Sequence, residues 1–76
     1  MNIYDLLQKC DDTISGRMDV MLLSEVAGLP LKANHKYPVT PTLTAFDEQE
    51  REIFLQLQVS QMFVDSDDRI LVKVEY

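Results

Sequence analysis

The sequence of 76 residues predicts a single α+β domain, residues 1–76, with one or two N-terminal helices packed on a three-stranded antiparallel β-meander. Two observations carry this prediction. Apolar residues near the start of the chain recur at helical spacing, and the C-terminal residues separate apolar from polar side chains when they are folded back on each other. A chain this short buries only ~60% of the surface that its unfolded form exposes, so both layers are needed to form a core.

Residues 3–14 show the clearest helical pattern. Their apolar side chains fall on one narrow stripe at the helical period, and the charged residues fall off it. The stripe consists of Ile3, Leu6, Leu7, Cys10 and Ile14. We expect Asn2 to cap the start of this helix through its side-chain oxygen, and Gly16 to end it in a left-handed conformation.

Residues 18–28 fit two interpretations. Asp19 has the right chemistry to cap a short helix that Gly28 closes and that Pro30 prevents from continuing. The same segment also alternates like a strand at Met18, Val20 and Leu22. The short helix is the preferred interpretation.

The segment 29–41 is expected to cross the surface as an extended linker. It contains three prolines, and each one biases its predecessor toward extended geometry: Pro30, Pro38 and Pro41. His35 lies in this linker, and no serine, cysteine or second histidine has a spacing that would make it catalytic. We therefore expect His35 to be exposed to solvent.

The C-terminal residues predict a hairpin with its turn at Asp65 to Asp68. In this register the inner face pairs Phe63 with Ile70, Val59 with Val74 and Leu57 with Tyr76. Gln61, opposite Val72, is the one polar residue on this face. The outer face pairs Val64 with Arg69, Met62 with Leu71, Ser60 with Lys73 and Gln58 with Glu75. One register that sorts most of two strands in this way rarely arises by chance.

A third strand is predicted at 42–46, so that the meander runs over 42–46, 52–64 and 69–76. The competing interpretation is a helix that starts at Asp47, because Asp47 and Glu50 have the spacing of a capping box. Alternating apolar residues favour the strand: Ile53, Leu55, Leu57 and Val59. Any helix is then expected to be a single turn near Asp47.

The charge of the chain restricts its partners. Thirteen acidic residues against seven basic ones give a net charge of −6. Phosphate backbones and anionic membranes repel such a chain, so we expect neither direct nucleic-acid binding nor membrane binding. The single cysteine, the lack of a secretion signal and the lack of an apolar run near ~20 residues favour a cytoplasmic location.

No motif for catalysis, a metal or a cofactor is present in the sequence. If the acidic turn were an EF-hand loop beginning at Asp65, its sixth and twelfth residues would be Gly and Glu, but they are Ile70 and Tyr76. Two glycines, Gly16 and Gly28, cannot build a Gly-rich phosphate loop. A domain of this size also has little room for a cleft. We therefore expect a protein that is not an enzyme and binds no cofactor.

The sequence instead predicts a surface for binding another protein. An apolar centre on the outer face of the sheet is expected from Met62, Val64 and Leu71, with Phe54 further along the middle strand, and its acidic rim from Asp65, Asp67 and Asp68. Coverage of these apolar residues by residues 18–28 or by the linker is an equally weighted alternative. Further carboxylates cluster at Asp11 and Asp12, and at Asp47, Glu48, Glu50 and Glu52.

The leading hypothesis is a small acidic inhibitor that occupies a basic, nucleic-acid-binding surface of a partner protein by imitating the charge of a nucleic acid. Small phage-encoded inhibitors of host defence are similar in size and charge, although this likeness concerns bulk composition alone and no residue motif. The alternative hypothesis is a structural or assembly protein that forms a homodimer through its sheet.

Overall fold

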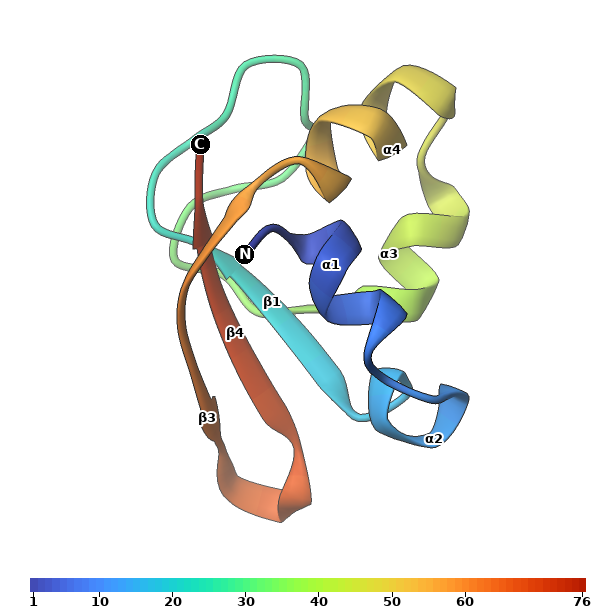
Figure 1. The fold of residues 1–76 in the computed structure, drawn as a ribbon. Coiled ribbons are helices and arrows are strands. Elements are labelled where there is room, and N and C mark those ends of the chain that lie inside the picture. Colours follow the sequence, from blue (N-terminus) through green and yellow to red (C-terminus); the bar gives the residue numbers. More distant parts are fainter.

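The computed structural model describes residues 1–76 except for the side chain of Ser66. Its strands are β1 (Met18–Leu22), β2 (Tyr37–Pro38), β3 (Gln58–Val64) and β4 (Ile70–Glu75), and they form one sheet in the order β2-β1-β4-β3. Its helices are α1 (Ile3–Gln8), α2 (Asp12–Ser15), α3 (Val39–Ala45) and α4 (Glu48–Leu55), and a 3-10 turn, η1 (Ser66–Asp68), joins β3 to β4. α1, α3 and α4 pack on one face of the sheet (Figure 1).

The predicted three-stranded antiparallel meander is wrong, although the class is α+β. The sheet is mixed, because β1 and β4 run parallel at its centre while β2 and β3 pair antiparallel at its edges. The segment 18–28 was expected to be a short helix, but its residues 18–22 form β1, one of the two central strands. All three alternating side chains of this strand are buried on the helix side: Met18, Val20 and Leu22. The expected strand at 42–46 lies mostly in α3.

The capping box at Asp47 decides the structure of the middle segment. The Asp47 carboxylate accepts from the Glu50 backbone N–H at 2.8 Å, and the Asp47 N–H donates to Glu50 Oε1 at 2.9 Å. The helix extends over eight residues rather than one turn, and the strand begins only at Gln58. α4 also buries Phe54 completely against Phe46, with ring centroids 5.3 Å apart, and this burial outweighs the strand-like alternation.

The predicted first helix, 3–14, is divided in two. Asn2 caps α1 as predicted, since its side chain accepts from the Asp5 N–H at 2.8 Å. α1 ends after one and a half turns, and Asp11 then caps α2 by accepting from the Ile14 N–H at 2.9 Å. Gly16 ends α2, but with a right-handed φ of −66° instead of the expected left-handed one.

The predicted linker, 29–41, is shorter than expected. Its residues Tyr37 and Pro38 form β2, and Pro41 lies in the first turn of α3, where the missing N–H leaves no helical hydrogen bond unmade. The positive φ of +90° in the preceding loop belongs to Gly28, beside the Ile53 side chain.

The β3–β4 hairpin forms, but its register is shifted between the start of β3 and the turn. Val59 faces Val74 and Gln58 faces Glu75, as predicted. A β-bulge between Val59 and Gln61 adds one residue to β3 and displaces every later pair. The observed pairs replace four predicted ones: Gln61 with Lys73, Met62 with Val72, Phe63 with Leu71 and Val64 with Ile70. The side chains after the bulge therefore lie on the faces opposite to those predicted.

Candidate protein-binding site

The candidate site is the turn end of the β3–β4 hairpin, which extends away from α3 and α4 (Figure 1). The Asp65 N–H donates to the Arg69 carbonyl oxygen at 2.6 Å and closes the turn. Within it, Asp67 and Asp68 have positive φ angles of 66° and 59°. Aspartate tolerates this left-handed region better than most residues, so the turn conformation itself favours short acidic side chains here.

Two ion pairs fasten the turn to the rest of the sheet. Arg69 donates to the Asp19 carboxylate through Nε at 2.9 Å and through Nη2 at 2.8 Å. The hydrogen bond to Asp19 and the negative charge of Asp19 raise the pKa of Arg69 above its ordinary value. Lys36, next to β2, pairs with Asp65 on the other side of the turn. The acidic turn is thus positioned by residues that are distant in sequence.

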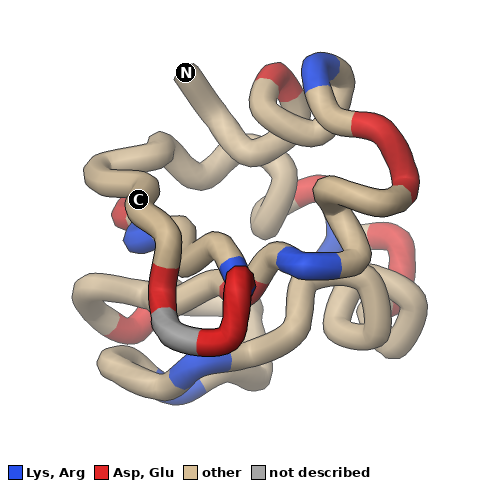
Figure 2. The backbone as a smooth tube through the Cα atoms, turned by 90° about the horizontal axis from the view of Figure 1, so that it is seen from below, with Lys and Arg blue, Asp and Glu red and all other residues tan. Residues whose placement is uncertain are grey.

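The other two carboxylates of the turn face solvent. Asp67 and Asp68 are both exposed, and neither makes an ion pair with any residue that the structure describes. Figure 2, which views the molecule from the hairpin end, shows the acidic turn with basic residues beside it. The turn therefore presents to solvent two carboxylates that make no ion pair with the described residues.

Three consecutive apolar side chains of β3 are exposed next to this turn. Met62 is 52% exposed, Phe63 44% and Val64 72%. Met62 and Val64 lie on the helix side of the sheet, beyond the reach of its helices. Phe63 lies on the opposite face, where the Lys73 ammonium is 5.6 Å from its ring centroid. Apolar surface thus borders the carboxylates on both faces of the strand.

The structure separates the apolar residues that the sequence grouped together. Leu71 is only 3% exposed, and it lies on the face opposite Met62 and Val64, between Asp19 and Phe63 in the register. Phe54 is completely buried in α4. These two residues are therefore unavailable to a partner in this conformation.

Phe63 is the site residue that sequence reasoning missed. The hairpin prediction placed it on the buried face, and the bulge turns it to the other face. A signal was present in the run Met62-Phe63-Val64, because an edge strand covered on one face cannot bury three successive side chains.

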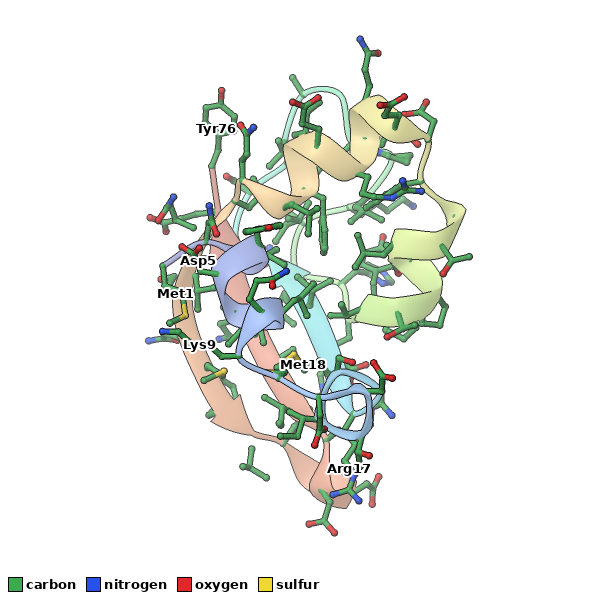
Figure 3. All side chains as sticks on the ribbon, turned by 45° about the vertical axis from the view of Figure 1, so that its right-hand side comes forward. Met1, Asp5, Lys9, Arg17, Met18 and Tyr76 are labelled. Atoms are coloured by element: carbon green, nitrogen blue, oxygen red, sulfur yellow. The ribbon has the colours of Figure 1, made fainter. Side chains whose placement is uncertain are left out.

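Three other carboxylates that the sequence predicted for the binding site lie far from the hairpin turn. Asp47, Glu48 and Glu50 belong to the start of that helix, at the end of the molecule opposite the hairpin turn (Figure 1). Asp47 and Glu50 are engaged in the capping box and stabilise the helix terminus. Figure 3, which is turned about the vertical axis from the view of Figure 1, shows Arg17 at the hairpin end of the molecule and Tyr76 at the other end. The carboxylates that the sequence predicted for the site therefore lie on two separate surfaces.

Outside the hairpin, the described residues were searched for metal sites, grooves with charged lining residues and membrane-spanning helices. The described residues contain no group of three or more His, Cys, Asp or Glu side chains that could hold a metal ion. A groove of about 470 Å³ between α1, α3 and α4 has one charged lining residue, Arg51, whose guanidinium donates to the Phe46 carbonyl oxygen at 3.3 Å. Among the described residues, every helix is too short or too polar to cross a membrane.

Comparison of the chain with protein-family models, with curated proteins and with solved structures found no match in any of the three. The functional conclusion therefore depends on the surface of the hairpin: exposed apolar residues on β3 beside exposed carboxylates in a turn that two ion pairs hold in place.

Proposed function

We propose that this protein is a non-enzymatic binding module that uses the turn end of its β3–β4 hairpin to occupy a basic surface of another protein. One observation carries the proposal: Met62, Phe63 and Val64 are exposed directly beside Asp67 and Asp68. An apolar centre with a charged rim is typical of protein–protein interfaces.

The net charge of −6 supports a basic partner. Opposite charges on two surfaces speed their encounter and disfavour partners of the wrong sign. Surfaces that bind nucleic acids carry lysine and arginine to neutralise phosphates, and an acidic protein that occupies such a surface inhibits it by competition. One free cysteine, Cys10, fits a protein that works in the reducing cytoplasm.

Matched charge variants test this proposal. Asp67→Asn with Asp68→Asn removes two charges from the turn, and asparagine keeps the left-handed conformation accessible. Glu48→Gln with Glu52→Gln removes the same charge from exposed positions on α4, at the other end of the molecule. The wild-type protein is used to capture a partner from the native host. We expect the first variant to lose this partner and the second to retain it. Added salt should release the partner from the wild-type protein.

Two results would contradict the proposal. One is capture that is equally strong with both variants, because the turn would then not contact the partner. The other is binding to the captured partner that is indifferent to ionic strength, because opposite charges would then contribute nothing. Circular dichroism of both variants shows that any loss of capture does not come from unfolding.

A further inference from the structure

The two edges of the sheet differ in how well they are protected. The β2 edge is two residues long and ends in Pro38, and both properties discourage pairing with another strand. The β3 edge is seven residues long, from Gln58 to Val64, and contains neither a charged residue nor a proline. Natural proteins usually place charged residues or prolines on an exposed edge strand to prevent it from pairing with another strand. Since β3 has neither, its edge is open to another strand.

The backbone of β3 shows which groups this edge presents. The Asp65 N–H points toward β4, where it donates to the Arg69 carbonyl oxygen. Backbone groups alternate in direction along a strand, so Phe63 also bonds toward β4, whereas Met62 and Val64 direct their N–H and C=O groups outward. On this outward side, opposite β4, no strand lies beside these two residues in the part of the chain that the structure describes.

The first part of the same edge already accepts an antiparallel segment. The Val59 N–H donates to the Met1 carbonyl oxygen at 2.8 Å, and the Ile3 N–H donates to the Leu57 carbonyl oxygen at 3.0 Å. These bonds form the antiparallel bridge between Asn2 and Gln58. The edge is therefore shaped for an antiparallel neighbour, and the bridge leaves the outer groups of Met62 and Val64 uncovered.

We propose that a second copy of this chain pairs antiparallel with β3 about a two-fold axis at Phe63, which joins the two sheets into one of eight strands. In this register Met62 of each copy lies opposite Val64 of the other, and all outward backbone groups of these residues are bonded. The two Phe63 side chains meet at the non-hydrogen-bonded position, where cross-strand side chains approach most closely.

Side-chain chemistry favours a second copy in this orientation. Exposed apolar residues meet apolar residues on both faces, because Met62 faces Val64 on one and Phe63 faces Phe63 on the other. Asp65 of each copy lies opposite the uncharged Gln61. The two Asp65 residues are about 13 Å apart along the strands, beyond the Debye length of about 8 Å. Parallel pairing would instead place the two acidic turns side by side.

The pairing uses apolar residues that the proposed function also uses, so a second copy and a partner protein compete for Met62, Phe63 and Val64. The pairing uses the edge of β3 and leaves the two acidic turns exposed at opposite ends of the new strand pair. The dimer therefore keeps both acidic turns accessible while it covers the apolar centre, and two separate measurements test the two ideas: sedimentation of the pure protein tests the pairing, and capture of a partner tests the function.

Sedimentation velocity of the pure protein tests the pairing. Over about a thousandfold range of concentration, we expect the mass to rise from one chain toward two. Val64→Pro removes an N–H that β4 does not use, so we expect it to raise the dissociation constant at least about tenfold. Val64→Thr keeps this N–H and the β-branched shape, and should dimerise like the wild type. A wild type that stays monomeric throughout, or equal dimerisation of both variants, would overturn the proposal.

Cross-linking tests the register even where the proline variant fails to fold. In a Cys10→Ser background, Phe63→Cys places two thiols opposite each other across the two-fold axis, within the distance that a disulfide spans. Gln61→Cys is the matched control, because its neighbour across the interface is Asp65. Mild oxidation should convert the first variant into a covalent dimer and leave the second largely monomeric. Equal cross-linking of both would refute this register.

Discussion

Asp19 and Arg69 show how a charged residue comes to lie in the middle of a small sheet. Asp19 belongs to the central strand, where its side chain is 12% exposed, and Arg69 covers it from the end of the hairpin with a side chain that is 39% exposed. The fork of the guanidinium satisfies both carboxylate oxygens. The pair therefore connects β1 to the acidic turn, which is 50 residues away in sequence.

Removing the two partners should have unequal effects. We expect Arg69→Met to lower the free energy of unfolding more than Asp19→Asn does. The first variant leaves an ionised, mostly buried carboxylate without donors, whereas in the second the half-exposed guanidinium can turn to water. Urea unfolding at neutral pH measures the order. The reverse order would mean that the pair contributes through Arg69 packing instead.

The raised pKa of Arg69 determines how this contribution depends on pH. A base whose pKa is higher in the folded state contributes stability fully below its unfolded pKa, and the contribution is lost as the pH rises through the folded value. For arginine both values lie far above neutrality. The Arg69 contribution should therefore be constant across the neutral and mildly alkaline range.

At the scale of the elements, α4 depends on its first turn. Four N–H groups at the start of a helix lack helical partners, and the Asp47–Glu50 box satisfies two of these positions reciprocally. The box also places the helix so that Phe54 enters the core and Leu57 follows it there. The end of α4 in turn determines where β3 starts.

We expect Asp47→Ala to lower the free energy of unfolding by about 1 kcal/mol, the usual cost of removing such a cap. Glu48→Ala is the control, since Glu48 occupies the same turn and makes no capping hydrogen bond, and it should cost only about 0.3 kcal/mol through the helix dipole. Urea denaturation followed by circular dichroism measures both. If both variants lost the same unfolding free energy, negative charge near the helix terminus would stabilise α4, and the hydrogen bonds of the capping box would not.

For the whole molecule, the excess of acidic residues opposes folding. With a net charge of −6 on a molecule 30 Å long, the carboxylates at its two ends and between them repel one another. Only two ion pairs, Lys36–Asp65 and Arg69–Asp19, offset this repulsion among the described residues. Salt should therefore screen more repulsion than attraction.

We expect added sodium chloride to raise the free energy of unfolding by roughly 1 kcal/mol or less, the scale of exposed charge interactions. Glu25→Lys with Glu52→Lys is the control: each change removes one negative charge and adds one positive charge, so the net charge moves from −6 to −2. This variant should respond less to salt in urea denaturation. A wild type destabilised by salt would show that attractive pairs dominate.

Features with local causes could be predicted from the sequence by itself. They include the α+β class, the Asn2 cap, the capping-box spacing at Asp47, and the hairpin that pairs Val59 with Val74. Each depends on hydrogen bonds or alternation within a few residues, or on strands joined by a short turn. The position of Asp67 and Asp68 in a turn could be predicted for the same reason, since turn chemistry is local.

Only the tertiary structure decided that residues 18–22 form the central strand, parallel to β4, because this pairing joins segments about 50 residues apart. The bulge at the start of β3 and the burial of Leu71 and Phe54 were decided there too. For residues 18–22 and for the segment that contains Phe54, both helix and strand were compatible with the local sequence. The choice depended on which one buried apolar side chains against distant partners, and such partners are absent from any short stretch of sequence.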